Sequence, residues 1–544
     1  MIAEFSSFRL VNKMNKLIYI YNHTLSYSNT ACRLVTHIED CGEPVDLFFE
    51  VDIEYAPYLV TETADAIIYL LLMYAIRKGI SIKSEIPVTS SFMYNLKEVL
   101  IPSLLLGDKS LHNVSIDAPL IDINFDAKGV GTGVSCGIDS FYTIMKHTSD
   151  EYADMKLTHL FISSCSIDLW KSGCKNIEEF KRHYSVMFDR YYGVSKDLNL
   201  PLVVGYSNYM EYIFDPKRIK IPLTAHHYNT MANVLCLRKL WKTYYFSSAE
   251  PFTYFDLTDN SKKTTCRHEL LSMHILAIPG FNCYSTGGSV SREEKTISIA
   301  DYPVAQKYLH PCFRSGFVKN CSNPPCSKCL RALLTLDLHD KLPSFKEVFD
   351  IDKYSKNKIK YFIRAFNLKD DEYISNLYIG LKSKYPKLMD QAEQWAIIEN
   401  KRKAFWSKFR KDITTNQSLP SGLVFGKNSG LTYYRIFILG IKPQINYRLT
   451  YSKNDDSVTL GLHCDDKNLY MLCIDVFRTV QNVISSDTNN EDSVKLDIQL
   501  SKNNYVNEFW DYISKVQNII KELYNIEELK FLPKNGEKTY ELIN

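Results

Sequence analysis

The sequence lacks a long hydrophobic run and a marked excess of either charge. Its most apolar stretch, AIIYLLLMYAI at 66–76, is far shorter than the roughly 20 residues that span a bilayer, so we expect a buried helix there. The N-terminus has no apolar core followed by a small-residue cleavage site, which argues against a secretory signal. With 65 Lys and Arg against 62 Asp and Glu, the charge balance indicates neither a nucleic-acid partner nor a membrane surface.

Disulfide chemistry is not expected either. The fourteen cysteines are scattered except for one cluster, and no secretion signal accompanies them, which favours a reducing cytoplasm over a disulfide framework. We therefore expect a cytoplasmic protein. A chain of 544 residues is too long for one ordinary core and predicts several domains of roughly 100–200 residues each.

Secondary-structure signals divide the chain into four regions. Residues 1–125 begin with strand-like alternation and continue into the apolar helix, which predicts a separate α+β region. Residues 126–345 alternate strand and helix signals, and residues 346–391 form a helical, charged linker. Residues 392–544 carry the strand-like runs YYRIFILGI, INYRLTYS and SVTLGLHC and two expected helices, at 467–484 and 505–529, which predicts a C-terminal α+β domain.

The second region has the pattern of an α/β domain. Its strand-like stretches GVGTGVS, LTHLFISS, LPLVVGYS and KTYYFSSA are each followed by a helix-like stretch. Strands separated by helices of this length join through right-handed crossovers, which predicts a doubly wound parallel sheet. Such folds bind ligands at the carboxyl ends of their strands. The loop after the first strand is therefore a candidate ligand site.

That loop is the glycine-rich turn in GVGTGVSCGIDSFYTIMKH, residues 129–147. Its alternating glycines allow another backbone or a ligand to approach one face of the strand. We expect Gly137 to adopt a positive φ angle, so that successive backbone N–H groups point into one concavity at the start of a helix. The turn is either an anion site of this kind or a plain strand–turn–helix connection. It is not a Walker A loop, because no Gly-Lys-Ser/Thr follows.

The turn also resembles the Ser-Gly-Gly-x-Asp-Ser pyrophosphate loop (PP-loop) of the N-type ATP pyrophosphatases, with a cysteine in place of the first glycine. The matching residues are Ser135, Cys136, Gly137, Ile138, Asp139 and Ser140. The resemblance implies that these residues bind the phosphates of ATP with Mg²⁺. It also implies that AMP is transferred to an oxygen of the substrate and that pyrophosphate is released.

Four cysteines form the one cluster, with the spacing Cys-x8-Cys-x4-Cys-x2-Cys: Cys312, Cys321, Cys326 and Cys329. Four thiolates with one tight Cys-x2-Cys pair suit a closed tetrahedral Zn²⁺ site. Such a site is structural, because four cysteines leave no open coordination position. The alternative is a loop with four free or redox-active cysteines.

Together, the loop and the cluster resemble the 7-cyano-7-deazaguanine synthases (QueC) over residues 125–345. Two stretches between them match in part, because AHHYNTMANVLCL keeps the family's Asn229 and TTCRHELL keeps Arg267. Tyr228 stands where the family has arginine. The stretch SREEKTISIAD resembles the family's lysine-containing helix, with Arg292 or Lys295 as the equivalent residue.

The family uses ATP to adenylate a carboxylate, and ammonia then displaces AMP to form an amide that a second round converts to a nitrile. The resemblance therefore implies an ATP-dependent, C–N bond-forming enzyme. Its implied catalytic residues are Asp139, Arg267, Lys295 and Arg331. Adenylation turns a poor leaving group into a good one, and the cationic side chains would stabilise negative charge at the α-phosphate.

Three functions remain open. The first is adenylation of a carboxylate or carbonyl of a small molecule or a protein. Relatives of the synthases occur in antiphage cassettes, and the C-terminal region resembles an α+β domain found in restriction and defence proteins. The second is sulfur or amide transfer to tRNA, which the balanced charge disfavours. The third is a nucleotide-binding regulatory or scaffold protein whose loop holds ATP without chemistry, since Cys136 and Tyr228 depart from the family pattern. All three are compatible with a homo-oligomer.

Overall fold

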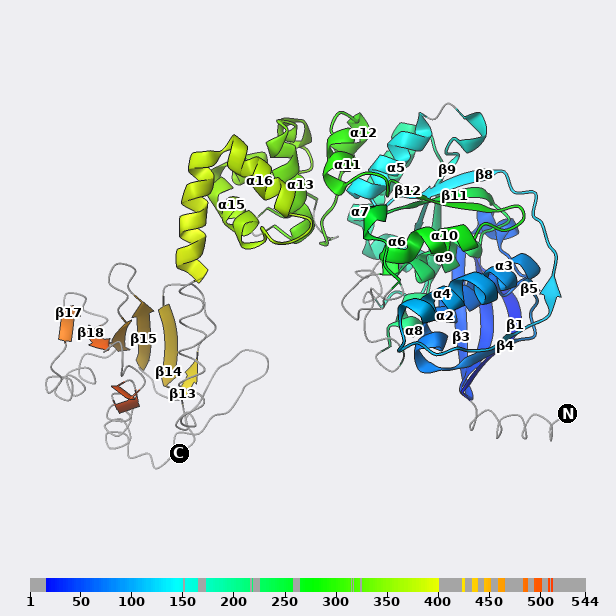
Figure 1. Ribbon diagram of the computed structural model, residues 1–544, viewed down its shortest axis with the longest axis horizontal. Helices are drawn as coiled ribbons and strands as arrows, with labels where there is room; N and C mark the ends of the chain where they lie inside the picture. The colour runs from blue at the N-terminus through cyan, green and yellow to red at the C-terminus, as the bar shows by residue number, and fades with distance from the viewer. Residues whose placement is uncertain are drawn as a thin grey trace. The chain divides into compact units, whose positions relative to one another are not determined.

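The computed structural model describes residues 16–149, 152–164, 173–215, 218, 226–257, 265–314, 316, 318–322 and 325–400, and after these the strands named below with 507–508 and 510–511. The chain forms two compact units (Figure 1). Unit 1 comprises Met1–Tyr361 and Lys369–Lys384, and unit 2 comprises Phe362–Leu368 and Tyr385–Asn544.

A ten-stranded sheet organises unit 1, in the order β12-β11-β8-β9-β10-β3-β2-β1-β4-β6. The strands are β1 (Leu17–Tyr27), β2 (Ala31–Asp40), β3 (Glu43–Asp52), β4 (Ser81–Ser84), β6 (Ile116–Asp117), β8 (Gly129–Gly133), β9 (His159–Ser163), β10 (Leu202–Ser207), β11 (Trp241–Ser247) and β12 (Asn282–Thr286). The short strands β5 (Val88–Thr89) and β7 (Leu120–Ile121) pair separately. The expectation of an α/β fold with a large, mostly parallel sheet is confirmed.

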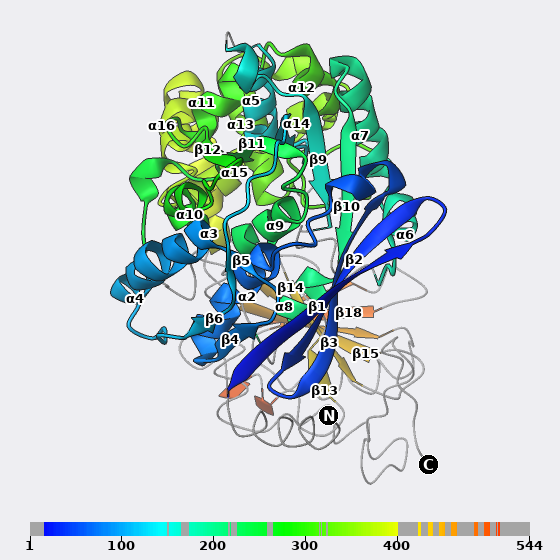
Figure 2. The same ribbon diagram turned by 90° about the vertical axis from the view of Figure 1, so that its right-hand side faces the viewer.

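The N-terminal strands extend this sheet and do not form one of their own. Strands β8 to β12 are parallel to one another. Strands β1, β2 and β3 form an antiparallel meander, which joins them through the antiparallel pairing of β3 with β10. Figure 2 shows the meander continuing the sheet beyond β10. Leu47, Phe49 and Val51 of β3 are buried at alternate positions. The sheet therefore runs across the boundary expected at residue 125.

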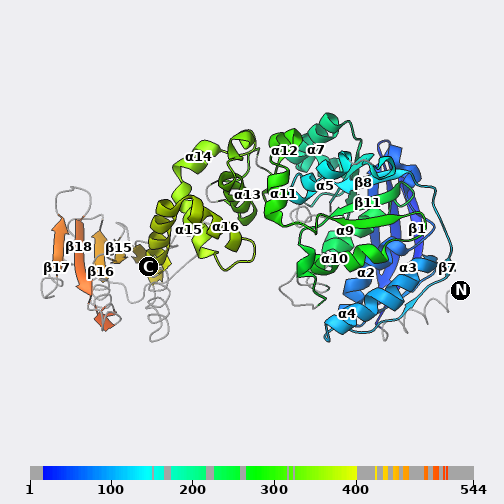
Figure 3. The ribbon, with the colours of Figure 1, turned by 45° about the horizontal axis from the view of Figure 1, so that its top comes forward.

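Helices cover both faces of the sheet (Figure 3). On one side lie α2 (Asp65–Lys78), α9 (His226–Leu235) and α10 (Glu269–Ile275), and on the other lie α5 (Ile138–Thr148), α7 (Ser185–Leu198) and α12 (Pro303–Tyr308). The helix α6 (Ile177–His183) precedes α7. No described helix is both long and apolar enough to cross a membrane.

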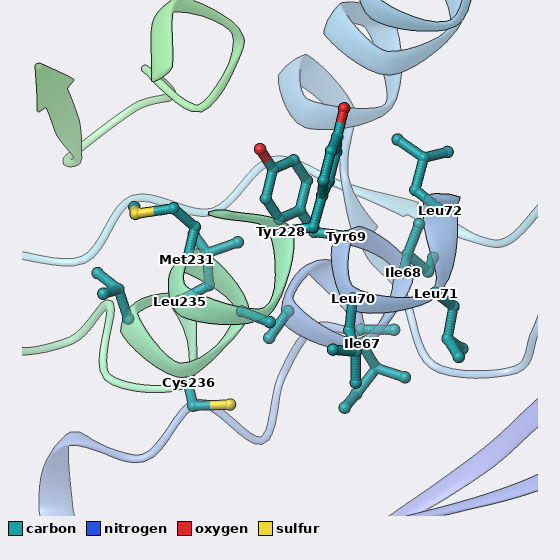
Figure 4. Close-up of a cluster of buried hydrophobic side chains, with 14 of the residues drawn as sticks. Ile67, Ile68, Tyr69, Leu70, Leu71, Leu72, Tyr228, Met231, Leu235 and Cys236 are labelled. Carbon is teal, nitrogen blue, oxygen red and sulfur yellow. The ribbon is translucent and has the colours of Figure 1, made fainter. Parts of the chain in front are cut away.

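The packing of α2 on α9 forms a large part of the core (Figure 4). Residues 65–76 of α2 are all buried, as expected for a helix that is apolar on every face. The rings of Tyr69 and Tyr228 lie 4.9 Å apart between their centroids. Gly79 ends α2 in the left-handed conformation, with a φ of 63°.

The alternating glycines of β8 make room for a tryptophan. A Cβ atom on Gly131 would lie 2.7 Å from Cζ3 of Trp241, and one on Gly129 would lie 2.6 Å from the carbonyl oxygen of Leu240. Trp241 is fully buried and begins the neighbouring strand β11. The group that approaches these glycines closely is therefore a core side chain, Trp241.

Further helices lie before, within and after the cysteine cluster, and a second sheet follows them. The helices are α11 (Arg292–Ser298), α13 (Ser327–Leu338), α14 (Ile351–Lys356), α15 (Lys358–Asn367) and α16 (Ser375–Lys384). Unit 2 contains the antiparallel strands β13 (Leu423–Phe425), β14 (Tyr433–Ile438), β15 (Ile445–Tyr451), β16 (Val458–Cys464), β18 (Val494–Leu500) and β17 (Val483–Asp487), in this order. The three expected strand runs are confirmed as β14, β15 and β16.

The two expected C-terminal helices fall mostly outside the described residues. Residues 467–482 of the first are not described, and the last two residues of its approximate range, 483–484, begin β17. Of the second, only 507–508 and 510–511 are described, and they are helical.

Candidate functional site

A cavity of about 290 Å³ lies at the carboxyl ends of β8, β9 and β11. Residues of the loop after β8 line it, together with residues of α5, α7, α11, α13 and α16. The order of the parallel strands reverses beside β8, since β9 and β10 follow on one side and β11 and β12 on the other. Ligands of open α/β sheets bind where the strand order reverses in this way.

The loop that leads from β8 to α5 turns sharply at Cys136. This residue has a φ of 56°, whereas Gly137 has a φ of −80°. The prediction that Gly137 adopts a positive φ is therefore wrong, because the left-handed residue comes one position earlier. The side chain of Cys136 is fully buried, and its carbonyl oxygen accepts a hydrogen bond from His310 N–H at 2.7 Å. Burial raises the pKa of the Cys136 thiol to about 12.

The two serines of the loop have different surroundings. The Ser140 hydroxyl is buried, donates to Gly133 O at 2.7 Å and accepts from Ser135 N–H at 3.2 Å. Ser140 therefore fixes the shape of the loop from behind. Ser135 lines the cavity, and its hydroxyl accepts from Gly137 N–H at 3.3 Å.

The first turn of α5 faces the cavity. Gly137, Ile138 and Asp139 line it, and among the described residues no side chain caps this helix end. The N–H groups of an uncapped first turn, together with the helix dipole, favour a bound anion. The loop therefore has the properties of an anion site.

Asp139 lies between two cations. Its carboxylate oxygens lie 3.0 Å from a terminal nitrogen of Arg292 and 3.2 Å from Nζ of Lys295. Burial acts to raise the pKa of Asp139, but the charges of Arg292, Lys295 and Lys328 outweigh it and hold the pKa below its ordinary value. Asp139 is therefore a carboxylate at neutral pH.

The two cations are held by the backbone after β11. Lys295 is 1 % exposed and also donates to Ser248 O at 2.7 Å, while Arg292 donates to Ala249 O at 2.6 Å. Arg292 lines the cavity, whereas Lys295 lies behind Asp139. Arg292 and Lys295, the two cations singled out from the sequence of α11, thus contact the same carboxylate.

Arg331 and Arg267 differ in their partners. Arg331 of α13 lines the cavity, its Nε is buried without a hydrogen-bond partner, and no described carboxylate forms an ion pair with it. Its guanidinium carbon lies 4.7 Å from the ring centroid of Tyr373. Arg267 does not line the cavity, and it forms an ion pair with Glu372 at 2.6 Å. Glu372 does line the cavity, so Arg267 lies at its edge.

Tyr373 closes part of the cavity wall from outside the region 126–345. Its hydroxyl donates to Glu250 Oε1 at 2.5 Å, and Arg292 and Arg331 both lie over its ring. Burial and the hydrogen bond to Glu250 raise the pKa of Tyr373. Sequence reasoning missed Tyr373 because nothing in its local pattern connects it with a loop more than two hundred residues earlier.

A second carboxyl group, that of Glu269, lies near Lys295 but does not line the cavity. Glu269, at the start of α10, is 2 % exposed and accepts from the Ser285 hydroxyl at 2.8 Å. Burial raises its pKa to about 7, although hydrogen bonds from Ser248 and Ser285 and the charge of Lys295 act in the opposite direction. Glu269 is therefore partly protonated at neutral pH.

The four clustered cysteines lie close enough together to hold a metal ion such as zinc. The sulfur atoms of Cys312, Cys321, Cys326 and Cys329 all lie within 4.8 Å of one another. Zn–S bonds of about 2.3 Å imply sulfur–sulfur distances of roughly 3.8 Å in a tetrahedron, so the arrangement fits. Three backbone N–H groups donate to these sulfurs, at 3.0, 3.3 and 3.4 Å, which favours the thiolate form that binds metals.

The cluster and the cavity share α13. Cys326 is the N-cap of α13 and Cys329 lies in its first turn, while Lys328 and Arg331 line the cavity. Cys312 lines it as well. Sequence reasoning assigned no role to Lys328, although its place inside the Cys-x2-Cys pair was a usable signal.

Comparison with known proteins adds no relative. No family model matches the chain, and neither a curated protein nor a solved structure matches it.

Proposed function

We propose that residues 126–345 form a doubly wound PP-loop domain of the QueC type, which binds ATP and adenylates a carboxylate or carbonyl group. One observation carries the proposal. The uncapped first turn of α5 opens into a cavity that Arg292, Lys328 and Arg331 also line. Backbone N–H donors and arginine side chains are what proteins use to bind phosphate groups. ATP supplies the adenylyl group in the chemistry of this family.

The loop residues have distinct roles in this proposal. Ser135, Gly137 and Ile138 offer backbone and hydroxyl donors to phosphate oxygens, and Cys136 and Ser140 hold the loop in shape. Each oxygen of Asp139 has one cationic partner and can accept a second contact. Asp139 can therefore contribute to binding Mg²⁺, which neutralises charge on a leaving pyrophosphate.

The cations differ in availability. Arg331 has no carboxylate partner among the described residues, so it is the best candidate to stabilise negative charge on a phosphate. Lys295 acts through Asp139, which it orients and keeps ionised. Arg267 is compensated by Glu372, so a carboxylate-bearing acceptor would reach it only by exchange with that side chain.

We infer that the metal is zinc and that it is structural. Purified protein is expected to contain one zinc per chain, measured by elemental analysis. The double variant Cys326→Ser, Cys329→Ser should lose it, because two of four ligands are removed. Full zinc retention in this variant would contradict the assignment, and Cys41→Ser serves as the control at a cysteine outside the cluster.

The test of the activity is release of pyrophosphate and AMP by the full-length chain. The protein is incubated with ATP, Mg²⁺ and a panel of carboxylic acids, and both products are quantified. Equal amounts of both are expected with at least one acceptor, and Asp139→Ala should abolish release. Asp197→Ala is the matched control, because it removes a surface carboxylate that forms an ion pair with Lys307 at 2.8 Å and does not line the cavity. Its activity should equal that of the wild type.

A stability measurement must accompany Asp139→Ala. Removing this carboxylate leaves the ammonium of Lys295 buried without its ionic partner, which destabilises proteins by about 3–5 kcal/mol when both charges are fully buried and by less here, where Asp139 is 23 % exposed. Activity is therefore compared below the melting temperature of the variant. ATP binding without pyrophosphate release across the panel would favour the scaffold, and release that requires tRNA would favour the transferase.

A further inference from the structure

The helix α13 starts inside the cysteine cluster. The Sγ of Cys326 accepts the N–H of Cys329 at 3.4 Å, so the first turn of the helix is built around two of the four clustered thiols. A bound metal fixes the geometry of a loop too short to pack itself, and the free energy of binding becomes folding free energy. The direction of α13 at its N-terminus therefore depends on the cluster.

One face of this first half of α13 points to the cavity. Lys328, Arg331 and Thr335 all line it, and their spacing of three and four residues places them on one face of the helix. The opposite face carries Leu330, Leu333 and Leu334, which are fully buried in the core. The helix cannot rotate to withdraw the basic side chains without exposing these leucines.

Lys328 is flanked by a second part of the cluster. Its ammonium lies 4.3 Å from the ring centroid of Phe313, which directly follows Cys312 and also lines the cavity. Lys328 therefore lies between two segments that carry clustered cysteines: its own helix start, with Cys326 and Cys329, and the segment of Cys312 and Phe313. The positive charge of Lys328 also helps to lower the pKa of Asp139, which lines the same cavity at the start of α5.

We propose that Lys328 binds the phosphate group that the first turn of α5 receives, and that the metal–thiolate cluster holds Lys328 in position to do so. The cluster is then a positioning element of the anion site as well as a structural one. This inference rests on the proposed function, because it assumes that the cavity binds phosphate. It adds a binding residue and makes anion affinity depend on the metal.

The test is titration calorimetry with inorganic pyrophosphate and the full-length, metal-loaded protein. Lys328→Gln should raise the dissociation constant about tenfold, the scale of one partly screened charge–charge contact. Lys328→Arg keeps the charge and should stay close to the wild type. Lys319→Gln is the matched control: this exposed lysine lies near the cluster and its ammonium donates to Lys346 O at 3.1 Å, but it does not line the cavity.

A second arm measures the contribution of the metal. Each protein is titrated again after chelation, with its fold checked by circular dichroism. Metal removal should weaken pyrophosphate binding at least tenfold in the wild type and by less in Lys328→Gln, because the variant has already lost the side chain that the cluster positions.

The outcomes separate the two proposals. If the wild type binds no pyrophosphate, the proposed function and this inference both fail. If it binds pyrophosphate and Lys328→Gln binds equally well, only this inference fails. If Lys328→Gln binds more weakly but chelation changes both proteins equally, the role of the cluster in positioning Lys328 is overturned.

Discussion

Cys136 combines a backbone conformation that suits glycine with a side chain that is fully buried. Its φ of 56° lies in the left-handed region, which costs non-glycine residues roughly 1 kcal/mol. Cys136→Ala keeps this cost and Cys136→Gly removes it, while both lose the packing of the thiol. We therefore expect the glycine variant to be about 1 kcal/mol more stable than the alanine variant, as measured by thermal melting. The order is reversed at an ordinary helix or strand position, and such an order here would contradict the loop geometry.

Glu269 provides a test of burial through pH. The pKa of Glu269 rises from its ordinary 4.5 to about 7 in the folded state. Ionising this carboxyl in the folded protein therefore costs on the order of 3 kcal/mol more than ionising it in the unfolded chain. The stability from the neutral carboxyl is fully present below pH 4.5 and is lost as pH rises through 7. Glu269→Gln does not titrate, so its melting temperature should gain on the wild type between these pH values. A constant difference across the range would show that Glu269 is not buried as described.

At the scale of the element, β8 is shaped by what packs against it. A Cβ on Gly131 would lie 2.7 Å from Trp241, whereas one on Gly133 would meet the hydroxyl of Tyr244 at an ordinary 3.5 Å. Gly131→Ala should destabilise the protein by about 1–3 kcal/mol, because a filled core must shift to admit the methyl group. Gly133→Ala is the matched control and should cost clearly less. Equal melting temperatures for the two variants would contradict the packing of Trp241 on β8.

The sequence predicts the individual strands and helices better than it predicts which strands pair with each other. The strands β8 to β11 and the helix α5 follow from local patterns of apolar residues and glycines, so they could be read from short windows. The pairing of β3 with β10 could not, because nothing in either strand names its partner. The same limit applies to the loop after β8. Residue type alone favours Gly137 for the positive φ, but Cys136 adopts it, with its carbonyl oxygen bonded to the distant His310 N–H.

At the scale of the whole molecule, the N-terminal region is part of the framework that holds the site. β3 covers the edge of β10, and α2 packs on α9 over a broad apolar surface. Deleting residues 1–125 would expose this surface and an unpaired strand edge, which promotes aggregation. We expect the truncated chain to be insoluble or to lack cooperative melting, while the full-length chain melts cooperatively. A soluble truncated protein with a sharp transition would show that the chain folds without residues 1–125.

The site itself is assembled from distant parts of unit 1. The loop after β8, the start of α13 and the turn before α16 meet at one cavity, although more than two hundred residues separate the first from the last. Local patterns found the loop and the cysteines because each is a compact motif. Tyr373, Glu372 and Glu250 have no such motif, and only the fold brings them to the cations.

A structure of the full-length protein with ATP and Mg²⁺ tests the central claim most directly. The account predicts that the triphosphate lies against the first turn of α5, within hydrogen-bond distance of backbone N–H groups of Gly137 and Ile138 and of the Arg331 guanidinium. Nucleotide bound elsewhere on the chain, or a cavity without nucleotide at saturating ATP, would contradict it.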